Sequence, residues 1–123
     1  MTPPQKSILV ADDDAAIVDA LTMILDLENY KVDTVLDGKV IQQIHKHPPD
    51  LLLLDIWMTG ADGKEICKQL KSDNKTKDIP VILISASRDL KKSAETAGAD
   101  GYIEKPFDMH VLLDTVRSFV HKS

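Results

Sequence analysis

Short runs of β-branched or leucine-rich residues alternate with longer segments of helical periodicity along this chain, and this alternation is the feature that most restricts its fold. The runs expected to form strands cover residues 7–11, 31–35, 51–54, 81–84 and 102–104. Strands that alternate with helices are typical of an α/β domain built on a parallel sheet. The sequence therefore predicts a (βα)5 fold, a doubly wound five-stranded parallel sheet with helices on both faces.

The composition of each run indicates its position in the sheet. Residues 8–11, 51–54 and 81–84 are apolar without interruption, as expected of central strands that helices cover on both faces. Residues 31–35 alternate between apolar and polar, and residues 102–104 are mixed, which suits edge strands.

The chain has 16 aspartates and only 4 glutamates, and the positions of the aspartates account for much of this excess. Helical spacing of apolar residues predicts helices over 15–27, from 40 to the breaker at 47–50, from 62 to beyond 70, over 89–97 and from 108 onward. Aspartate is a favoured N-cap residue because its carboxylate accepts hydrogen bonds from the free N–H groups of a first helical turn. The expected caps are Asp14, Asp62, Asp89 and Asp108, with Glu65 completing a capping box after Asp62.

A length of 123 residues indicates one domain, which we expect to span residues 7–122 after a flexible lead-in over residues 1–6. The net charge of −5 disfavours direct nucleic-acid binding, which needs a clustered basic face. No apolar run approaches the roughly 18 residues of a membrane span, and residues 1–6 lack a secretory apolar core, so a cytoplasmic location is expected.

Several other polar or reactive residues have simple structural interpretations. Cys67 is the only cysteine, which excludes an intramolecular disulfide and favours a small buried side chain. Lysines at 64, 68, 71 and 75 are interpreted as a solvated face of the third helix and its exit. The histidines share no metal-ligand spacing and are expected at the surface; they are His45, His47, His110 and His121.

Polar residues follow four of the predicted strands at the point where each strand ends. They are Asp12 and Asp13, Asp55, Ser85 and Lys105. The carboxyl ends of parallel strands lie along one edge of the sheet, where ligands of such folds bind. Two carboxylates about 4 Å apart repel each other by about 4 kcal/mol at an effective dielectric constant of 20, so three in one crevice need a cation. Because all candidate ligands are oxygens, the pattern indicates Mg²⁺, or alternatively Mn²⁺, and phosphoryl chemistry.

Asp55 combines a fixed backbone with a side chain at the mouth of this crevice. Its strand is expected to be central and buried, while an ordinary carboxylate is ionised at neutral pH and can attack phosphorus without a general base. We expect Lys105 to pair with one phosphoryl oxygen and the hydroxyl of Ser85 to donate to another.

These residues stand in motifs that resemble the response-regulator receiver domain, the CheY-like fold of two-component signalling. The resemblance covers nearly the whole chain and rests on residues 8–14 (ILVADDD), 55–63 (DIWMTGADG), 85–86 (SA) and 97–107 (AGADGYIEKPF). It implies the flavodoxin-like strand order 2-1-3-4-5. The family pattern usually has proline where this chain has Thr59.

The resemblance also implies roles for individual residues. Asp55 would be the phosphoacceptor, and Asp12, Asp13, Asp55 and the backbone carbonyl of Trp57 would bind Mg²⁺. Ser85 and Tyr102 would form the conformational switch, Trp57 and Ser87 would modulate the lifetime of the phosphoryl group, and a cis peptide between Lys105 and Pro106 would aim the lysine.

The family further implies its partners. The phosphoryl group would come from a histidine kinase or a histidine phosphotransfer protein, and a downstream protein or effector domain would bind the surface of the fourth helix, fifth strand and fifth helix. The expected function is a switch and not a turnover enzyme.

Two alternatives stay open at this stage. A degenerate receiver would act only as a binding module, although the acidic, serine and lysine positions are all intact. A phosphatase with an aspartyl nucleophile, as in haloacid-dehalogenase-like enzymes, would need a second aspartate two residues after the nucleophile, where this chain has Trp57.

Overall fold

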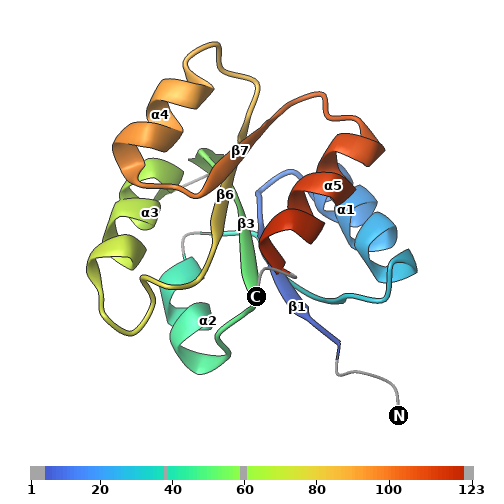
Figure 1. Ribbon diagram of the computed structural model, residues 1–123, viewed down its shortest axis with the longest axis horizontal. Helices are drawn as coiled ribbons and strands as arrows, with labels where there is room; N and C mark the ends of the chain where they lie inside the picture. The colour runs from blue at the N-terminus through green and yellow to red at the C-terminus, as the bar shows by residue number, and fades with distance from the viewer. Residues whose placement is uncertain (1–4, 38, 59–60, 121–123) are drawn as a thin grey trace.

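The computed structural model describes residues 5–37, 39–58 and 61–120. Figure 1 shows helices packed on both sides of a central sheet. The elements in chain order are β1 (Ser7–Ala11), α1 (Ala15–Leu27), β2 (Lys31–Val35), α2 (Val40–Lys46), β3 (Leu51–Asp55), β4 (Trp57–Met58), β5 (Ala61–Asp62), α3 (Gly63–Ser72), β6 (Val81–Ser85), α4 (Leu90–Ala97), β7 (Gly101–Glu104) and α5 (Met109–Val120).

The main sheet has five parallel strands in the order β2-β1-β3-β6-β7. Counted as the main-sheet strands of the chain, this is the order 2-1-3-4-5, so the predicted fold class is confirmed. The three uninterrupted apolar runs are the central strands, and the two mixed runs are the edges. The strands β3 and β6 each extend one residue further than predicted, which places Asp55 and Ser85 in the strands themselves.

The pair β4 and β5 was not predicted. Trp57 pairs with Asp62 and Met58 with Ala61 in an antiparallel ladder directly after the loop that follows β3. Two-residue strands carry no recognisable periodicity, so pattern analysis cannot detect them.

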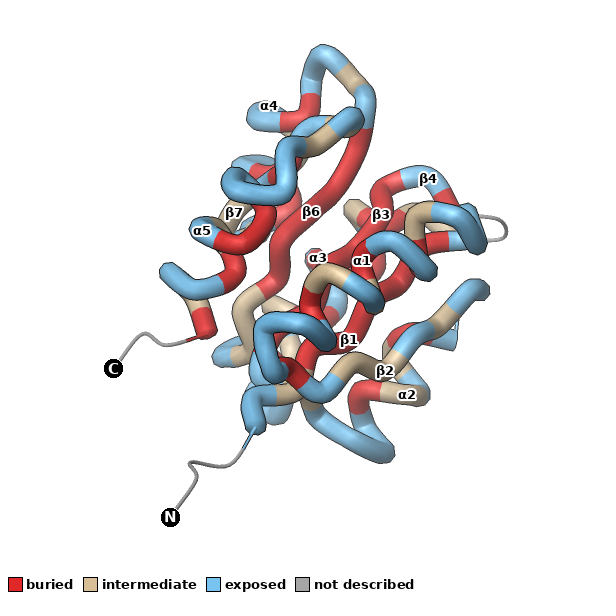
Figure 2. Tube along the Cα trace, turned by 90° about the vertical axis from the view of Figure 1, so that its right-hand side faces the viewer, coloured by how far each residue is buried: buried red, intermediate tan, exposed pale blue. Residues whose placement is uncertain are grey.

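Two apolar cores lie on opposite faces of the sheet. Helices α1 and α5 enclose one core against β1, β3 and β6, and α2, α3 and α4 enclose the other. The central strands β3 and β6 are buried along their whole length, and β1 is buried from Ile8 to Ala11, while the outer helix faces are exposed (Figure 2). This arrangement follows from the uninterrupted apolar composition of these strands, which have no solvated face.

Three of the four predicted aspartate caps accept hydrogen bonds from first-turn N–H groups. Asp14 caps α1 at Ala16, Asp62 caps α3 at Lys64, and Asp108 accepts from the N–H of His110. The prediction for Asp89 is wrong: it occupies the N-cap position of α4, but its side chain makes no capping bond there. The carboxylate of Glu65 pairs with Lys68 at 3.4 Å.

Lys71 differs from the solvated lysine expected on α3. Its ammonium forms a 2.6 Å ion pair with Asp100 and donates to the carbonyls of Lys77 and Ile79 at 3.1 and 2.8 Å. This one side chain therefore joins α3 to the segment before β6 and to the turn before β7.

The remaining structural expectations have mixed outcomes. Cys67 is fully buried, and burial raises the pKa of its thiol to about 11, which keeps it protonated at neutral pH. His45, His47 and His110 are exposed, while His121 lies outside the described residues. The expected lead-in lies mostly outside them too, so the domain limits stay predictions. No helix in the described part of the chain is long and apolar enough to cross a membrane.

Candidate functional site

Three carboxylates meet at the carboxyl edge of the sheet, as the sequence predicts. Oxygen atoms of Asp12, Asp13 and Asp55 all lie within 4.8 Å of one another. Asp12 and Asp13 follow β1, and Asp55 is the last residue of the neighbouring strand β3. Asp12 is 1% exposed and Asp55 is 5% exposed, whereas Asp13 faces solvent. An oxygen-only cluster of this kind fits a hard divalent cation.

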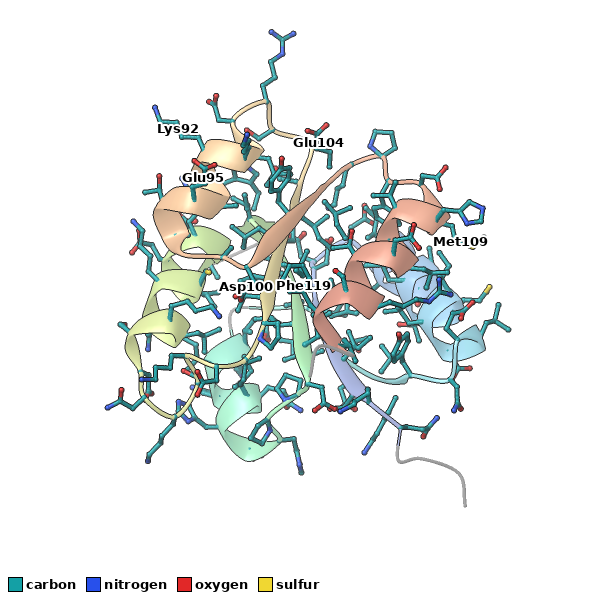
Figure 3. All side chains as sticks on the ribbon, in the orientation of Figure 1. Lys92, Glu95, Asp100, Glu104, Met109 and Phe119 are labelled. Carbon is teal, nitrogen blue, oxygen red and sulfur yellow. The ribbon has the colours of Figure 1, made fainter. Side chains whose placement is uncertain are left out.

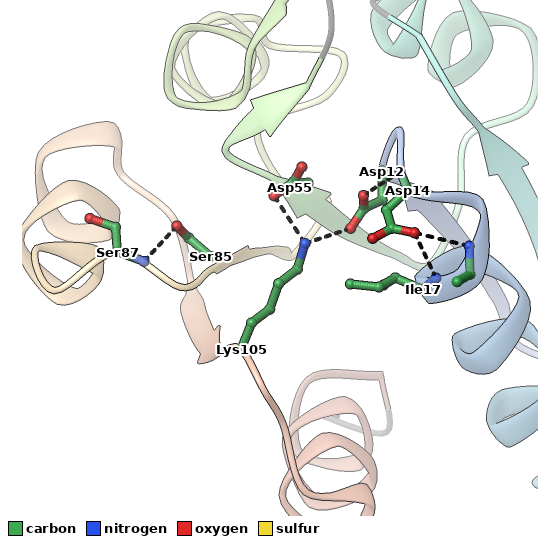
Figure 4. A network of polar contacts seen from close by, with 8 residues as sticks. Asp12, Asp14, Ile17, Asp55, Ser85, Ser87 and Lys105 are labelled. Atoms are coloured by element: carbon green, nitrogen blue, oxygen red, sulfur yellow. Dashed lines mark hydrogen bonds and ion pairs between the residues drawn. The ribbon is translucent and has the colours of Figure 1, made fainter.

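Lys105 reaches into the cluster from the loop after β7. Its Nζ lies 3.0 Å from Oδ2 of Asp12 and 3.4 Å from Oδ1 of Asp55, so one ammonium bridges both buried carboxylates (Figure 4). The predicted cis peptide between Lys105 and Pro106 is present. The N–H of Lys105 donates to the carbonyl of Ser85 at 3.0 Å, which ties this loop to the end of β6.

Asp12 and Asp55 are held in different ways. The N–H of Asp14 donates to Oδ1 of Asp12 at 2.9 Å, so that carboxylate has a fixed donor on each oxygen. Burial raises the pKa of Asp55, and the charge of Asp12 raises it further, while Lys105 and the N–H of Trp57 oppose these effects. Asp55 is thus a buried carboxylate whose ionised form is less favourable in the folded protein than in water.

Lys105 carries a positive charge in this environment. Burial lowers the pKa of Lys105, but its hydrogen bond to Asp12 and the charges of Asp55 and Asp12 outweigh that effect, and the net pKa is raised. The ammonium therefore stays protonated at neutral pH and is available to an incoming anion.

Two serine hydroxyls organise the segment between β6 and α4. Ser85 is 2% exposed, and its Oγ accepts a hydrogen bond from the N–H of Ser87 at 3.0 Å. The Oγ of Ser87 in turn accepts from the N–H of Asp89 at 3.3 Å. Figure 4 shows Ser85 and Ser87 beside the acidic cluster. The chain of contacts leads from the site edge to the residue before α4.

Gly63 and the residues after β3 hold α3 close to Asp55. The N–H of Gly63 donates to the carbonyl of Ile56 at 2.8 Å. A Cβ at position 63 would clash with the carbonyl oxygen of Asp55, so only glycine fits this close approach. This role was not predicted, because the sequence around a glycine that follows an N-cap residue does not indicate which backbone atoms lie beside it.

The side chains of Tyr102 and Trp57 are exposed and do not belong to the carboxylate cluster. Tyr102 lies on the edge strand β7 and is 39% exposed, and Trp57 is 64% exposed. The Nζ of Lys64 lies 5.4 Å from the centroid of the Trp57 ring, a cation–π contact that the sequence did not indicate. Thr59, the position at which the family pattern differs, lies outside the described residues.

Comparison with known proteins establishes the family. The model of the response regulator receiver domain matches residues 8–117. This chain therefore belongs to the receiver domains of response regulators, which serve two-component signalling.

Among known relatives, the DNA-binding dual master transcriptional regulator RpaA of Synechocystis sp. is 34% identical over 119 residues, which cover 94% of this chain and 49% of that protein. The response regulator MprA of Mycobacterium leprae is 33% identical, with coverage of 94% and 51%. The chain thus spans about half the length of these relatives.

Solved structures agree with the family and the fold. A putative response regulator from Chloroflexus aurantiacus superposes with a TM-score of 0.91 at 30% identity, over 97% of this chain and 100% of that one. The chemotaxis protein CheY4 of Vibrio cholerae gives a TM-score of 0.86 at 25% identity, over 94% and 99% of the two chains.

Proposed function

We propose that this chain is a phosphoacceptor switch in which Asp55 receives the phosphoryl group. The observation that carries the proposal is the convergence of Asp12, Asp13, Asp55 and Lys105 at one edge of the sheet. Receiver domains of response regulators pair with histidine kinases, so the donor is a histidine kinase or a histidine phosphotransfer protein. The product is a signalling state of the protein, and the chain is not a turnover enzyme.

The transfer itself needs little from the protein beyond positioning and charge. A carboxylate oxygen of Asp55 forms a bond to phosphorus, and the bond from phosphorus to the donor nitrogen breaks with its electron pair leaving on the imidazole. Lys105, already 3.4 Å from Asp55, pairs with a phosphoryl oxygen. The hydroxyl of Ser85 donates to a second oxygen while it continues to accept from Ser87.

Mg²⁺ fits the donor set of this site, and Mn²⁺ is the alternative. The carboxylates of Asp12, Asp13 and Asp55, with the backbone carbonyl of Trp57, would hold the ion. Such an ion neutralises the charge that develops on the phosphoryl oxygens. Among the described residues, no cysteine or histidine belongs to this metal-binding cluster, which disfavours zinc.

The switch would run from Ser85 to the surface of α4, β7 and α5. When the Ser85 hydroxyl turns toward the phosphoryl group, it keeps the hydrogen bond from the N–H of Ser87 and draws Ser87 with it. Because Ser87 accepts from the N–H of Asp89, this movement would shift the start of α4. Tyr102, half exposed on β7, then rotates inward, and the surface presented to a downstream protein or effector domain changes. Trp57 and Ser87 flank the acceptor and would set how fast water removes the phosphoryl group.

Phosphorylation with a small donor tests the assignment. Acetyl phosphate with Mg²⁺ should add one phosphoryl mass to the unmodified protein, as intact mass spectrometry would detect. The Asp55→Asn variant should gain none, because an amide cannot form the acyl phosphate. Asp114→Asn, on the exposed face of α5, is the matched control and should be labelled normally.

Three outcomes would contradict the proposal in different ways. Equal labelling of Asp55→Asn would place the acceptor elsewhere. Failure to bind Mg²⁺ or beryllofluoride would favour the pure binding module. Sustained turnover of a phosphomonoester would favour the aspartyl phosphatase.

A further inference from the structure

A polar groove between α3 and α4 has no part in the proposed phosphoryl chemistry. Its volume is about 330 Å³, and it is lined by Lys64 and Lys68 from α3 and by Lys92, Ser93 and Thr96 from α4. Figure 3 shows Lys92 projecting outward from α4. Ammonium and hydroxyl groups are the donors that bind anions in water-accessible sites.

The charges of the groove are incompletely balanced. Glu65 and Asp89 also line it, and Glu65 is paired with Lys68 at 3.4 Å. In the described part of the chain, Lys64 and Lys92 form no ion pair with a carboxylate. A cationic groove on a chain of net charge −5 would repel cations and attract anions locally, against the field of the whole molecule.

An exposed tryptophan adjoins this groove. Lys64 lines the groove, and its Nζ lies 5.4 Å from the centroid of the Trp57 ring, which is 64% exposed. A tryptophan this exposed is uncommon in a domain surface and is enriched at the centres of protein interfaces. The combination offers a flat apolar anchor next to cationic groups.

The spacing of the lysines matches an extended acidic chain. Lys64 and Lys68 are one helical turn apart, a rise of about 6 Å. Alternate side chains of an extended peptide point to the same face about 6.6 Å apart. Carboxylates at every second residue of such a peptide can therefore pair with Lys64 and Lys68 at the same time. A single small anion cannot reach both lysines in this way.

We propose that the α3–α4 groove, with Trp57 at its margin, binds an extended acidic segment of a partner protein. Successive carboxylates of that segment pair with Lys64 and Lys68 along α3, and Lys92 meets a carboxylate from the α4 side of the groove. Acceptors of the segment take hydrogen bonds from Ser93 and Thr96, and an apolar group covers the Trp57 ring. The groove shares α4 with the surface of the proposed switch, but its other wall is α3, and no residue of β7 or α5 lines it.

Intrinsic fluorescence gives a direct test because Trp57 is the only tryptophan. The probe is a synthetic peptide of about six residues in which Glu alternates with Ser, titrated at about 10 mM salt, where the screening length is about 30 Å. A saturable change in fluorescence is expected, and calorimetry of the same titration supplies the Kd independently. The matching Lys and Ser peptide should not bind.

Matched variants separate the groove from general charge attraction. Lys64→Gln and Lys92→Gln should each weaken binding by about threefold to fivefold, the effect of one exposed charge pair. Lys91→Gln removes the same charge from the residue before Lys92 in α4, but Lys91 is not among the residues that line the groove. The Kd of the peptide for this variant should stay within about twofold of the value for the unchanged protein. These lysines are at least partly exposed, so the variants should fold, as circular dichroism would verify.

Three results would overturn the proposal. Equal losses of peptide affinity in Lys91→Gln and Lys92→Gln would show that the binding depends only on net charge. Binding of ATP or inorganic phosphate with the same lysine dependence, without binding of the peptide, would identify a small-anion site. The absence of saturation would exclude an acidic peptide. The titrations contain no Mg²⁺ and no phosphodonor, so their outcome is independent of phosphorylation at Asp55.

Discussion

At the scale of single residues, Asp55, the proposed acceptor, differs from Asp12 in the hydrogen bonds that its carboxylate receives. Asp12 receives a backbone N–H on one oxygen and the Lys105 ammonium on the other at 2.9 and 3.0 Å. Asp55 shares the same ammonium at a longer 3.4 Å and faces the charge of Asp12. A buried carboxylate with incomplete stabilisation is suited to forming a bond with an electrophile.

The same imbalance predicts how Asp55→Asn changes stability with pH. Burial and the charge of Asp12 raise the pKa of Asp55 above its ordinary value of 3.8. The Asp55 carboxyl group therefore binds its proton more tightly in the folded state than in the unfolded state. The contribution of Asp55 to stability therefore falls as pH rises through the interval between the two pKa values. Without Mg²⁺, the Asp55→Asn variant should be more stable at pH 7 than the protein with the unchanged sequence. The difference in free energy of unfolding between the two should shrink below pH 3.8.

Urea unfolding at several pH values measures this effect. Asp114→Asn, an exposed aspartate on α5, serves as the control and should show no comparable gain. A loss of stability in Asp55→Asn at pH 7 would mean that the bond to Lys105 outweighs burial and repulsion.

At the scale of elements, the position of α3 depends on contacts at both of its ends. Gly63 lets its first turn approach the carbonyl of Asp55, and Lys71 ties its last turn to Asp100 and to two carbonyls before β6. The helix thus bridges the loop after β3 and the segment before β6. A shift of α3 would disturb Asp55 and the proposed peptide groove together.

Lys71→Ala tests the second of these anchors. The substitution removes the donor of the Lys77 and Ile79 carbonyls and leaves Asp100 with the N–H of Val81 as its partner. It should lower the free energy of unfolding by about 1–3 kcal/mol. Lys75→Ala, an exposed lysine just after α3, should change it by no more than about 0.5 kcal/mol. Urea unfolding compares the two, and equal effects would show that Lys71 acts only through surface charge.

At the scale of the whole molecule, a ligand at the sheet edge is linked to folding. The three carboxylates come from two strands that only the folded chain brings together, so a cation bound there stabilises the folded state alone. At ten times its Kd, Mg²⁺ should add about 1.4 kcal/mol. For a domain of this size, that corresponds to a rise in Tm of about 5 °C.

Thermal unfolding with and without Mg²⁺ measures this linkage. Asp12→Asn should lose most of the rise, because it removes a ligand charge from the cluster. Sodium chloride at equal ionic strength is the control for general screening. An equal rise in Asp12→Asn would place the Mg²⁺ elsewhere.

The sequence alone determined the fold class, the strand positions and the carboxylates, serine and lysine at the sheet edge. This was possible because strand periodicity is local, and because every strand of a parallel sheet ends at the same edge. Asp12, Asp55, Ser85 and Lys105 could be found by reading the residue at or after each strand end. The strand order and the cis peptide came from family resemblance, because neither is encoded in local spacing.

Tertiary structure alone decided which polar groups meet. Lys71 was expected to be solvated but is joined to Asp100, and Lys64 lies over Trp57 from a different element. Asp89 stands where a cap should be, yet its side chain makes no such bond. These outcomes depend on where long side chains lie once the helices pack against the sheet. Charge, helical period and N-cap preference describe only a few neighbouring residues, so they do not indicate which residues distant in sequence come into contact.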